Sequence, residues 1–140
     1  MLTEHIISPL VDAEGKALGT TGPHGVNVVP VSGLKVTDDT VVLFDFFMHK
    51  TIENLQAEPE ISLAAWIGFK GIQLKATAEY LDEGPLFEDA VERMKTDFPD
   101  RTLDGIILLR PHTVYDISTG PNAGTLLAST EGEHARPHAA

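Results

Sequence analysis

Hydrophobic and polar residues alternate with a period of two along much of the chain. Residues 72–80 show this most clearly, with Ile, Leu, Ala, Ala and Tyr at every second position and Gln, Lys, Thr and Glu between them. Shorter stretches at 16–21, 26–36, 40–44 and 61–67 end at Gly or Asp turns. These patterns predict antiparallel strands with one face in a core and the other in solvent.

The last predicted strand, residues 105–117, differs because it is apolar on both faces. Ile106 to Leu109 are consecutive large aliphatic residues, and Val114, Tyr115 and Ile117 continue the apolar pattern. A strand of this kind needs cover on both sides. We therefore expect more hydrophobic surface here than one core covers, which favours a homodimer.

Three segments have helical spacing instead. We expect a short opening helix over residues 3–7, a helix of about two turns from Thr51 to the residue before Pro59, and a longer helix over 85–98 that ends at Pro99. Six short strands, Gly and Pro turns and inserted helices predict a mainly β fold, a small antiparallel barrel with helices at its ends.

The length of 140 residues, 42% of them hydrophobic, suits one globular domain. We assign that domain to residues 1–118. After Thr119 the sequence loses its periodicity and consists largely of Gly, Ala, Pro and small polar residues. Such a segment buries too little apolar surface to offset the entropy of ordering it. We therefore expect a flexible C-terminal tail over residues 119–140.

The amino-acid composition argues against several classes of binding partner and site. The net charge is −11, and no run of basic residues opposes it locally, which argues against nucleic acid. The absence of cysteine excludes disulfides and thiolate nucleophiles or metal ligands. No stretch approaches the roughly 20 apolar residues of a membrane span, and the N-terminus lacks the basic flank of a signal sequence. We expect a cytoplasmic protein that binds no membrane.

One lysine stands alone in an acidic part of the sequence. Lys50 is the only Lys or Arg between Lys35 and Lys70, an interval that holds six Asp and Glu residues. In His49-Lys50-Thr51 a strand gives way to a helix, so unpaired N–H groups, a hydroxyl and an ammonium can converge on one anion, for which phosphate is the natural choice. The alternative is that Thr51 is an ordinary N-cap and Lys50 a solvated charge.

Three segments, in fixed order, resemble the pyridoxamine 5'-phosphate oxidase-like superfamily of FMN-binding split barrels. They are KALGTTGPHGVNVVPV at 16–31, HKTIENLQAEPEISLAAW at 49–66 and GIQLKATAEYL at 71–81, and the resemblance covers about residues 3–118. It implies an antiparallel, six-stranded Greek-key split barrel. It also implies a homodimer with the flavin at the subunit interface.

The resemblance further implies where FMN binds. The second strand of the first hairpin is similar to the strand that runs under the flavin ring and contacts it largely through backbone groups, and its apolar residues suit a flat ring. The helix start resembles the basic or Lys-Thr pair that holds the phosphate, and a glutamine on a later strand resembles one that reaches the cofactor. The implied FMN-binding residues are Asn27, Val28, Val29, Pro30, Val31, Ser32, His49, Lys50, Thr51 and Gln73.

Two departures from the oxidase narrow the function. Its C-terminal segment carries tryptophan and an Arg/His cluster that closes on pyridoxal phosphate, whereas residues 118–140 here contain no Trp and one Arg. Asn27 stands where the oxidase has arginine, and His49 replaces the first basic residue of the phosphate pair, so the phosphate contact falls mainly on Lys50. We expect an FMN-dependent redox or electron-transfer protein that is not the true oxidase.

The sequence leaves other functions as alternatives. They are a non-catalytic FMN carrier or store, a related barrel that uses deazaflavin F420 or haem, and an interaction domain with an empty cleft. No side chain stands out as a general acid or base, so we assign no catalytic residue. The six histidines lack metal-like spacing, and the pair His134 and His138 lies in the expected tail, so we expect no metal site.

Overall fold

Antiparallel strands make up most of the structure, a computed structural model that describes residues 1–130. The strands are β1 (Gly15–Thr20), β2 (Asn27–Pro30), β3 (Leu34–Thr37), β4 (Thr40–Asp45), β5 (Glu60–Ile67), β6 (Lys70–Leu81), β7 (Gly105–Asp116) and β8 (Leu126–Ser129). The helices are α1 (Glu4–Asp12), α2 (His49–Ala57) and α3 (Pro85–Asp97). Within residues 1–130, no helix is long and apolar enough to cross a membrane.

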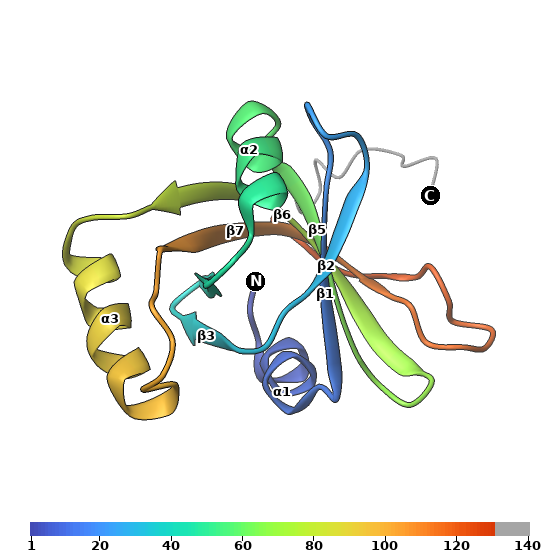
Figure 1. Cartoon of the computed structure of the whole chain (residues 1–140). Coiled ribbons are helices and arrows are strands. Elements are labelled where there is room, and N and C mark those ends of the chain that lie inside the picture. Colours follow the sequence, from blue (N-terminus) through green and yellow to red (C-terminus); the bar gives the residue numbers. More distant parts are fainter. Residues whose placement is uncertain (131–140) are drawn as a thin grey trace.

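The strands form one curled sheet in the order β2–β1–β5–β6–β7–β4–β3, and β8 pairs with β7. Every pairing is antiparallel. In Figure 1, α1 and α2 lie at opposite ends of the curled sheet, and α3 lies on its outside, where it contacts β7. The predicted mainly β, antiparallel split barrel with inserted helices is therefore confirmed, with eight strands in place of six.

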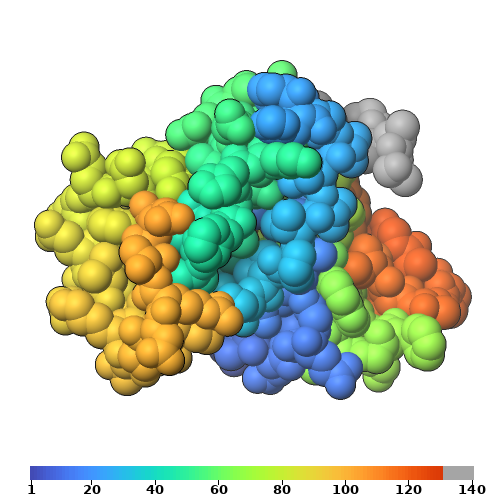
Figure 2. All heavy atoms as spheres, in the orientation of Figure 1, coloured from blue at the N-terminus to red at the C-terminus, as the bar shows by residue number. Residues whose placement is uncertain are grey.

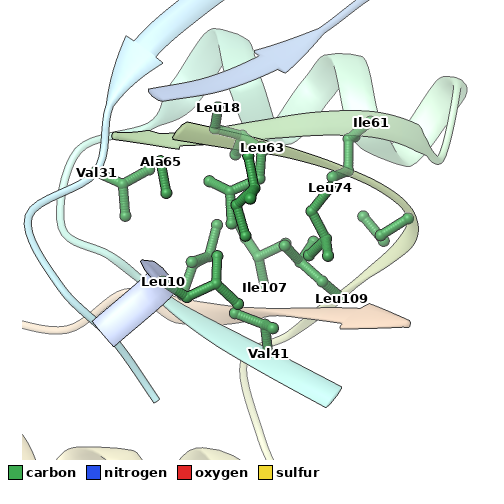
Figure 3. Packing of buried hydrophobic residues seen from close by; sticks show 14 of the residues in the cluster. Leu10, Leu18, Val31, Val41, Ile61, Leu63, Ala65, Leu74, Ile107 and Leu109 are labelled. Atoms are coloured by element: carbon green, nitrogen blue, oxygen red, sulfur yellow. The ribbon is translucent and has the colours of Figure 1, made fainter. Parts of the chain in front are cut away.

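The main core fills the inside of the curl. Figure 3 shows leucines and isoleucines from α1, β1, β5, β6 and β7 pointing into it. Six of them are completely buried: Leu10, Leu18, Leu63, Leu74, Ile107 and Leu109. Each such side chain contributes about 1.5–3 kcal/mol relative to an exposed one. The alternation along the strands thus becomes an apolar inner face that α1 closes from one end.

A second cluster explains why β7 is apolar on both faces. Ile107 and Leu109 point into the barrel core, whereas Ile106 and Leu108 pack on the other side with residues of α3 such as Met94. The expectation that Ile106 to Leu109 leave hydrophobic surface for a second copy is wrong. The chain covers this strand with its own third helix, so any dimer has to use another face.

The structure departs from the predicted elements at three places. The predicted strand 26–36 is broken between β2 and β3, immediately after Pro30. Helix α1 continues through Pro9, because buried side chains on both sides of it fix the turn. In the predicted tail, residues 126–129 form β8 beside the half of β7 that β4 does not reach. Residues 131–140 of that tail lie outside the described residues.

Candidate functional site

Strand β2 is one of the two ends of the sheet order, so one of its edges has no partner strand among residues 1–130. The N–H of Val31 donates to the carbonyl oxygen of Lys16 on β1, at 3.0 Å. Since hydrogen-bonded residues alternate along an antiparallel strand, Val29 and Asn27 also turn their backbone groups toward β1. The N–H and C=O of Val28 and the C=O of Pro30 therefore face the open edge.

Helix α2 begins at His49, two residues earlier than the sequence predicts. Met48 is its N-cap residue and makes no side-chain capping bond. The buried carboxylate of Asp45 instead accepts a hydrogen bond from the N–H of Met48 at 2.8 Å. Thr51 lies inside the first turn, so it is not the N-cap. The N–H groups of the first turn consequently lack intrahelical partners, as at any helix start.

A hydrogen bond joins the start of β2 to the start of α2. The side-chain amide of Asn27 donates to the hydroxyl oxygen of Thr51 at 3.1 Å, and Thr51 is buried. Two segments 24 residues apart in sequence, both predicted to contact FMN, thus meet in one place. His49 and Lys50, on the same turn, are exposed to solvent. Lys50 has no carboxylate partner in the described part of the chain.

Asn54 is the residue that holds this arrangement together, and the sequence analysis missed it. Its side chain is completely buried on α2. Its amide nitrogen donates to the carbonyl of Gly25 at 2.9 Å and to the hydroxyl of Thr20 at 3.2 Å, and its oxygen accepts from the N–H of His24 at 2.9 Å. The turn that leads into β2 is therefore fixed to α2 from three directions.

Two further contacts tighten the same turn. His24 Nε2 lies 2.8 Å from a carboxylate oxygen of Glu53 on α2. Gly22 has a φ of +154°, and a Cβ at this position would lie 3.0 Å from the Cα of Asn54. Because a side chain here meets both unfavourable backbone geometry and a crowded neighbour, the turn 22–25 reaches α2 only with glycine at 22.

A cleft of about 330 Å³ opens between the end of β2 and the segment that joins β4 to α2. Its volume lies at the low end of the range of small-molecule sites. Figure 2 shows the β4–α2 segment on this face of the molecule, between the β2 region and the loop that follows α3. The cleft is lined by Val29, Pro30, Val31, Ser32, Phe44, Phe46, Phe47, Met48 and Arg101.

Four of the ten predicted residues, 29–32, line this cleft, and Asn27 and Thr51 lie where β2 meets α2. His49 lines a neighbouring hollow with Asp45 and Asp104. The side chain of Val28 points to the outer face of the sheet and is 65% exposed. The aromatic lining from residues 44–47 and Arg101 were not predicted as site residues.

Gln73 is not brought to the cleft of its own chain. It is half-buried on the outer face of β6, in one row with Ala64 of β5, Ala17 of β1 and Pro30 of β2. Three strand spacings separate Gln73 from Pro30, which is about 14 Å along the sheet. Within a single copy Gln73 therefore does not reach a ligand that lies in the cleft.

Beneath the start of α2, Tyr80 supports the carboxylate that orients Met48. The hydroxyl of Tyr80 donates to Asp45 at 2.8 Å. Burial, and then the hydrogen bond and negative charge of Asp45, raise the pKa of Tyr80 above its ordinary value. A Cβ on Gly105 would overlap the phenol ring, so the ring reaches Asp45 only because residue 105 has no side chain.

Replacing Tyr80 by phenylalanine is expected to lower the free energy of unfolding by about 2 kcal/mol at pH 7, because Asp45 loses a charge-assisted hydrogen bond. The raised pKa means that the folded state favours the neutral phenol. Its contribution is fully present well below pH 10, the ordinary pKa of a free tyrosine, and falls as the pH rises through and above that value. Urea unfolding at pH 7 and pH 11 should show the difference between wild type and Y80F shrinking at the higher pH.

Comparison with known proteins identifies the family of the chain. Residues 11–119 match the sequence model of pyridoxamine 5'-phosphate oxidase. An uncharacterized protein of Methanocaldococcus jannaschii is 33% identical over 135 residues, which are 93% of this chain and 90% of that protein.

Solved structures with this fold include several whose names give a cofactor, and these cofactors differ. HupZ of Group A Streptococcus has a TM-score of 0.75 at 19% identity and covers 89% of this chain and 100% of its own. An FMN-binding protein of Syntrophomonas wolfei has a TM-score of 0.67 at 20% identity, with 81% and 82% covered. An F420 reductase and HutZ, the heme storage protein of Vibrio cholerae, follow with TM-scores of 0.62 and 0.64. These identities show the fold alone.

Proposed function

The chain belongs to the pyridoxamine 5'-phosphate oxidase family, and from this premise we propose that it is an FMN-binding flavoprotein with a redox or electron-transfer role. One observation carries the proposal. The open edge of β2 and the start of α2 border the same region, and the hydrogen bond from Asn27 to Thr51 ties them together. Two chemically different halves of FMN therefore have complementary partners side by side.

The residues fit each half of the cofactor. A flavin ring offers a flat apolar surface and a pyrimidine edge of hydrogen-bonding groups, and β2 presents apolar side chains together with the free backbone groups of Val28 and Pro30. A phosphate suits the unpaired N–H groups of the first turn of α2 and the ammonium of Lys50. When bound, FMN would supply hydride or single-electron transfer at its ring.

Within the proposed site the protein positions the cofactor and excludes water, and Asn54 is the residue that sets the position. It fixes the turn 22–25 against α2, and this turn determines where β2 starts. The phenylalanines of the cleft keep the ring out of water. We assign no general acid or base, because no carboxylate, histidine or tyrosine is among the residues of the described range 1–130 that line the cleft.

The spectrum of the purified protein tests the proposal directly. We expect a yellow protein with flavin absorption, which releases FMN on denaturation in about one equivalent per chain. Reduction by NADH or NADPH in a stopped-flow instrument then separates a reductase from an FMN carrier. A Soret band or a deazaflavin spectrum would identify haem or F420 instead, and a colourless protein that takes up none of the three would refute the proposal.

We also propose a homodimer with the flavin at the subunit interface. The support is the outer face of the sheet around Gln73, where the neighbouring strands present the small residues Ala17 and Ala64 and the exposed side chains of Val28 and Trp66. A second copy packed on this face would cover exposed apolar surface. Gln73 could then reach the flavin bound to the other copy.

Sedimentation velocity at micromolar concentration is expected to give the mass of two chains, because the apolar outer face is then covered. Replacing Ala64 by glutamate should place like charges opposite each other in such a dimer and shift the protein to a monomer with less flavin. A wild-type monomer that still holds a full equivalent of flavin would contradict both the dimer and the role of Gln73.

A further inference from the structure

Arg101 occupies an unusual position beside the cleft. It lies on the loop between α3 and β7, and its guanidinium carbon is 5.2 Å from the ring centre of Phe46 and 4.7 Å from that of Phe98. Both distances are within the range of favourable cation–π contacts. The loop is fixed near both of its ends, since the N–H of Arg101 donates to the carbonyl of Phe98 at 3.0 Å and that of Asp104 donates to the carbonyl of Asp45 at 2.9 Å.

Arg101 has no carboxylate partner among residues 1–130, although carboxylates are close to it in sequence. Asp100 and Asp104 line the adjoining hollow together with Arg101, yet within residues 1–130 no carboxylate oxygen lies within 4.0 Å of its guanidinium. Arg93 and Arg110, by contrast, pair with Asp97 and Glu79. Arginine uses its donors most effectively in bidentate contacts with a planar anion. In Arg101 these donors are exposed and held in place by two aromatic rings.

We propose that Arg101 binds the carboxylate or other planar anionic group of the molecule that reacts with the flavin, so that the partner substrate is a small organic anion with an apolar body. This inference rests on the proposed function. Arg101 borders the cleft that is also lined by the β2 residues assigned to the flavin ring. A ligand that enters beside the ring meets apolar walls, chiefly Phe46, Phe47 and Met48, and one unpaired cation.

The cleft and the charge together select this class of ligand. A neutral apolar molecule would remove water from the guanidinium without supplying an anion in its place. A strongly hydrated anion without an apolar body would gain little from contact with the phenylalanines. Because the whole chain carries a net charge of −11, an unpaired cation is also the feature that lets an anion approach this surface.

Benzoate and its neutral analogue benzamide test the proposal on the FMN-loaded protein. We expect benzoate to perturb the flavin absorption spectrum and to bind more tightly than benzamide. Arg101→Gln should weaken benzoate binding roughly 10- to 150-fold, the range of one charge-assisted hydrogen bond, and should leave benzamide binding unchanged. Arg101→Lys keeps the charge but not the planar guanidinium, so its affinity for benzoate should lie between those of wild type and Arg101→Gln. Arg110→Gln, on a surface ion pair, is the matched control and should change neither ligand.

Three results would overturn the proposal. One is that wild-type protein binds benzoate no better than benzamide. Another is that Arg101→Gln leaves benzoate affinity unchanged. The third is that this variant loses FMN but not riboflavin, since Arg101 would then hold the cofactor phosphate. A protein that retains no FMN refutes the proposed function instead, and calorimetry of benzoate with the FMN-free chain still decides whether Arg101 binds anions.

Discussion

Replacing Asn54 by leucine is expected to lower the free energy of unfolding by about 3 kcal/mol or more. Leucine keeps the branched skeleton of asparagine but is larger, so overpacking adds to the loss from polar groups. The carbonyl of Gly25 and the N–H of His24 would each lose a hydrogen-bond partner in a partly buried place, and the hydroxyl of Thr20 would lose one in the interior. Each orphaned group costs about 1–3 kcal/mol. Urea unfolding with a constant slope measures the change.

Two other variants separate the loss of the Asn54 hydrogen bonds from the general effect of replacing an asparagine. Asn122 lies on the exposed loop before β8, and Asn122→Leu should change stability by no more than about 0.5 kcal/mol. Asn54→Asp keeps the acceptor for His24 but removes both donated bonds, so it should be destabilised and should also bind FMN more weakly, because the turn before β2 is released. An Asn54→Leu protein with wild-type stability would show that the turn needs no anchoring to α2.

The second large effect concerns the phosphate. Lys50→Met keeps most of the side-chain stem and removes the ammonium, which otherwise has no ion-pair partner among residues 1–130. If Lys50 contacts the FMN phosphate, the affinity for FMN should fall roughly 10- to 150-fold, the value of a charge-assisted hydrogen bond of about 1.5–3 kcal/mol. Riboflavin shares the ring and ribityl chain but lacks the phosphate. Its affinity should hardly change, and salt should weaken FMN more than riboflavin.

The decisive quantity is the ratio between the loss of FMN affinity and the loss of riboflavin affinity in Lys50→Met. Lys35→Met, at an exposed lysine on β3, removes the same net charge elsewhere and should affect neither ligand. Equal weakening of FMN and riboflavin by Lys50→Met would indicate a structural defect. No weakening of either would mean that Lys50 is a solvated surface charge, as the alternative interpretation of the sequence holds.

The strands were predictable because their information is local. The alternation over residues 72–80 places Leu74 in the core and Lys75 in solvent regardless of what else the chain does, and β6 follows it. The limits of β2 and α2 were less predictable. Helix α2 begins before Thr51, directly after a turn that the hydrogen bond from Met48 to Asp45 fixes. This contact depends on the turn and not on helical spacing.

The unpredicted features depend on contacts between distant parts of the chain. The sequence shows that residues 106–109 need cover on two sides, but nothing local indicates that α3 supplies it. The roles of Asn54 and Arg101 have the same origin, since one acts on a turn about 30 residues away and the other on Phe46, 55 positions earlier. In the sequence, an asparagine on a predicted helix and a Gly-Pro turn elsewhere in the chain are only a weak signal that the two are in contact. For Arg101 the sequence offers none.

The open edge of β2 also bears on how the protein is made. A strand edge with free backbone groups is a template to which another chain can add, and natural proteins limit this risk with short edge strands and with proline. Strand β2 is four residues long and contains Pro30, so both devices are present. They still leave the N–H and C=O of Val28 exposed. In the proposed site, the group that completes this edge is the cofactor, so supplying flavin during expression would protect the newly folded chain from aggregating through β2.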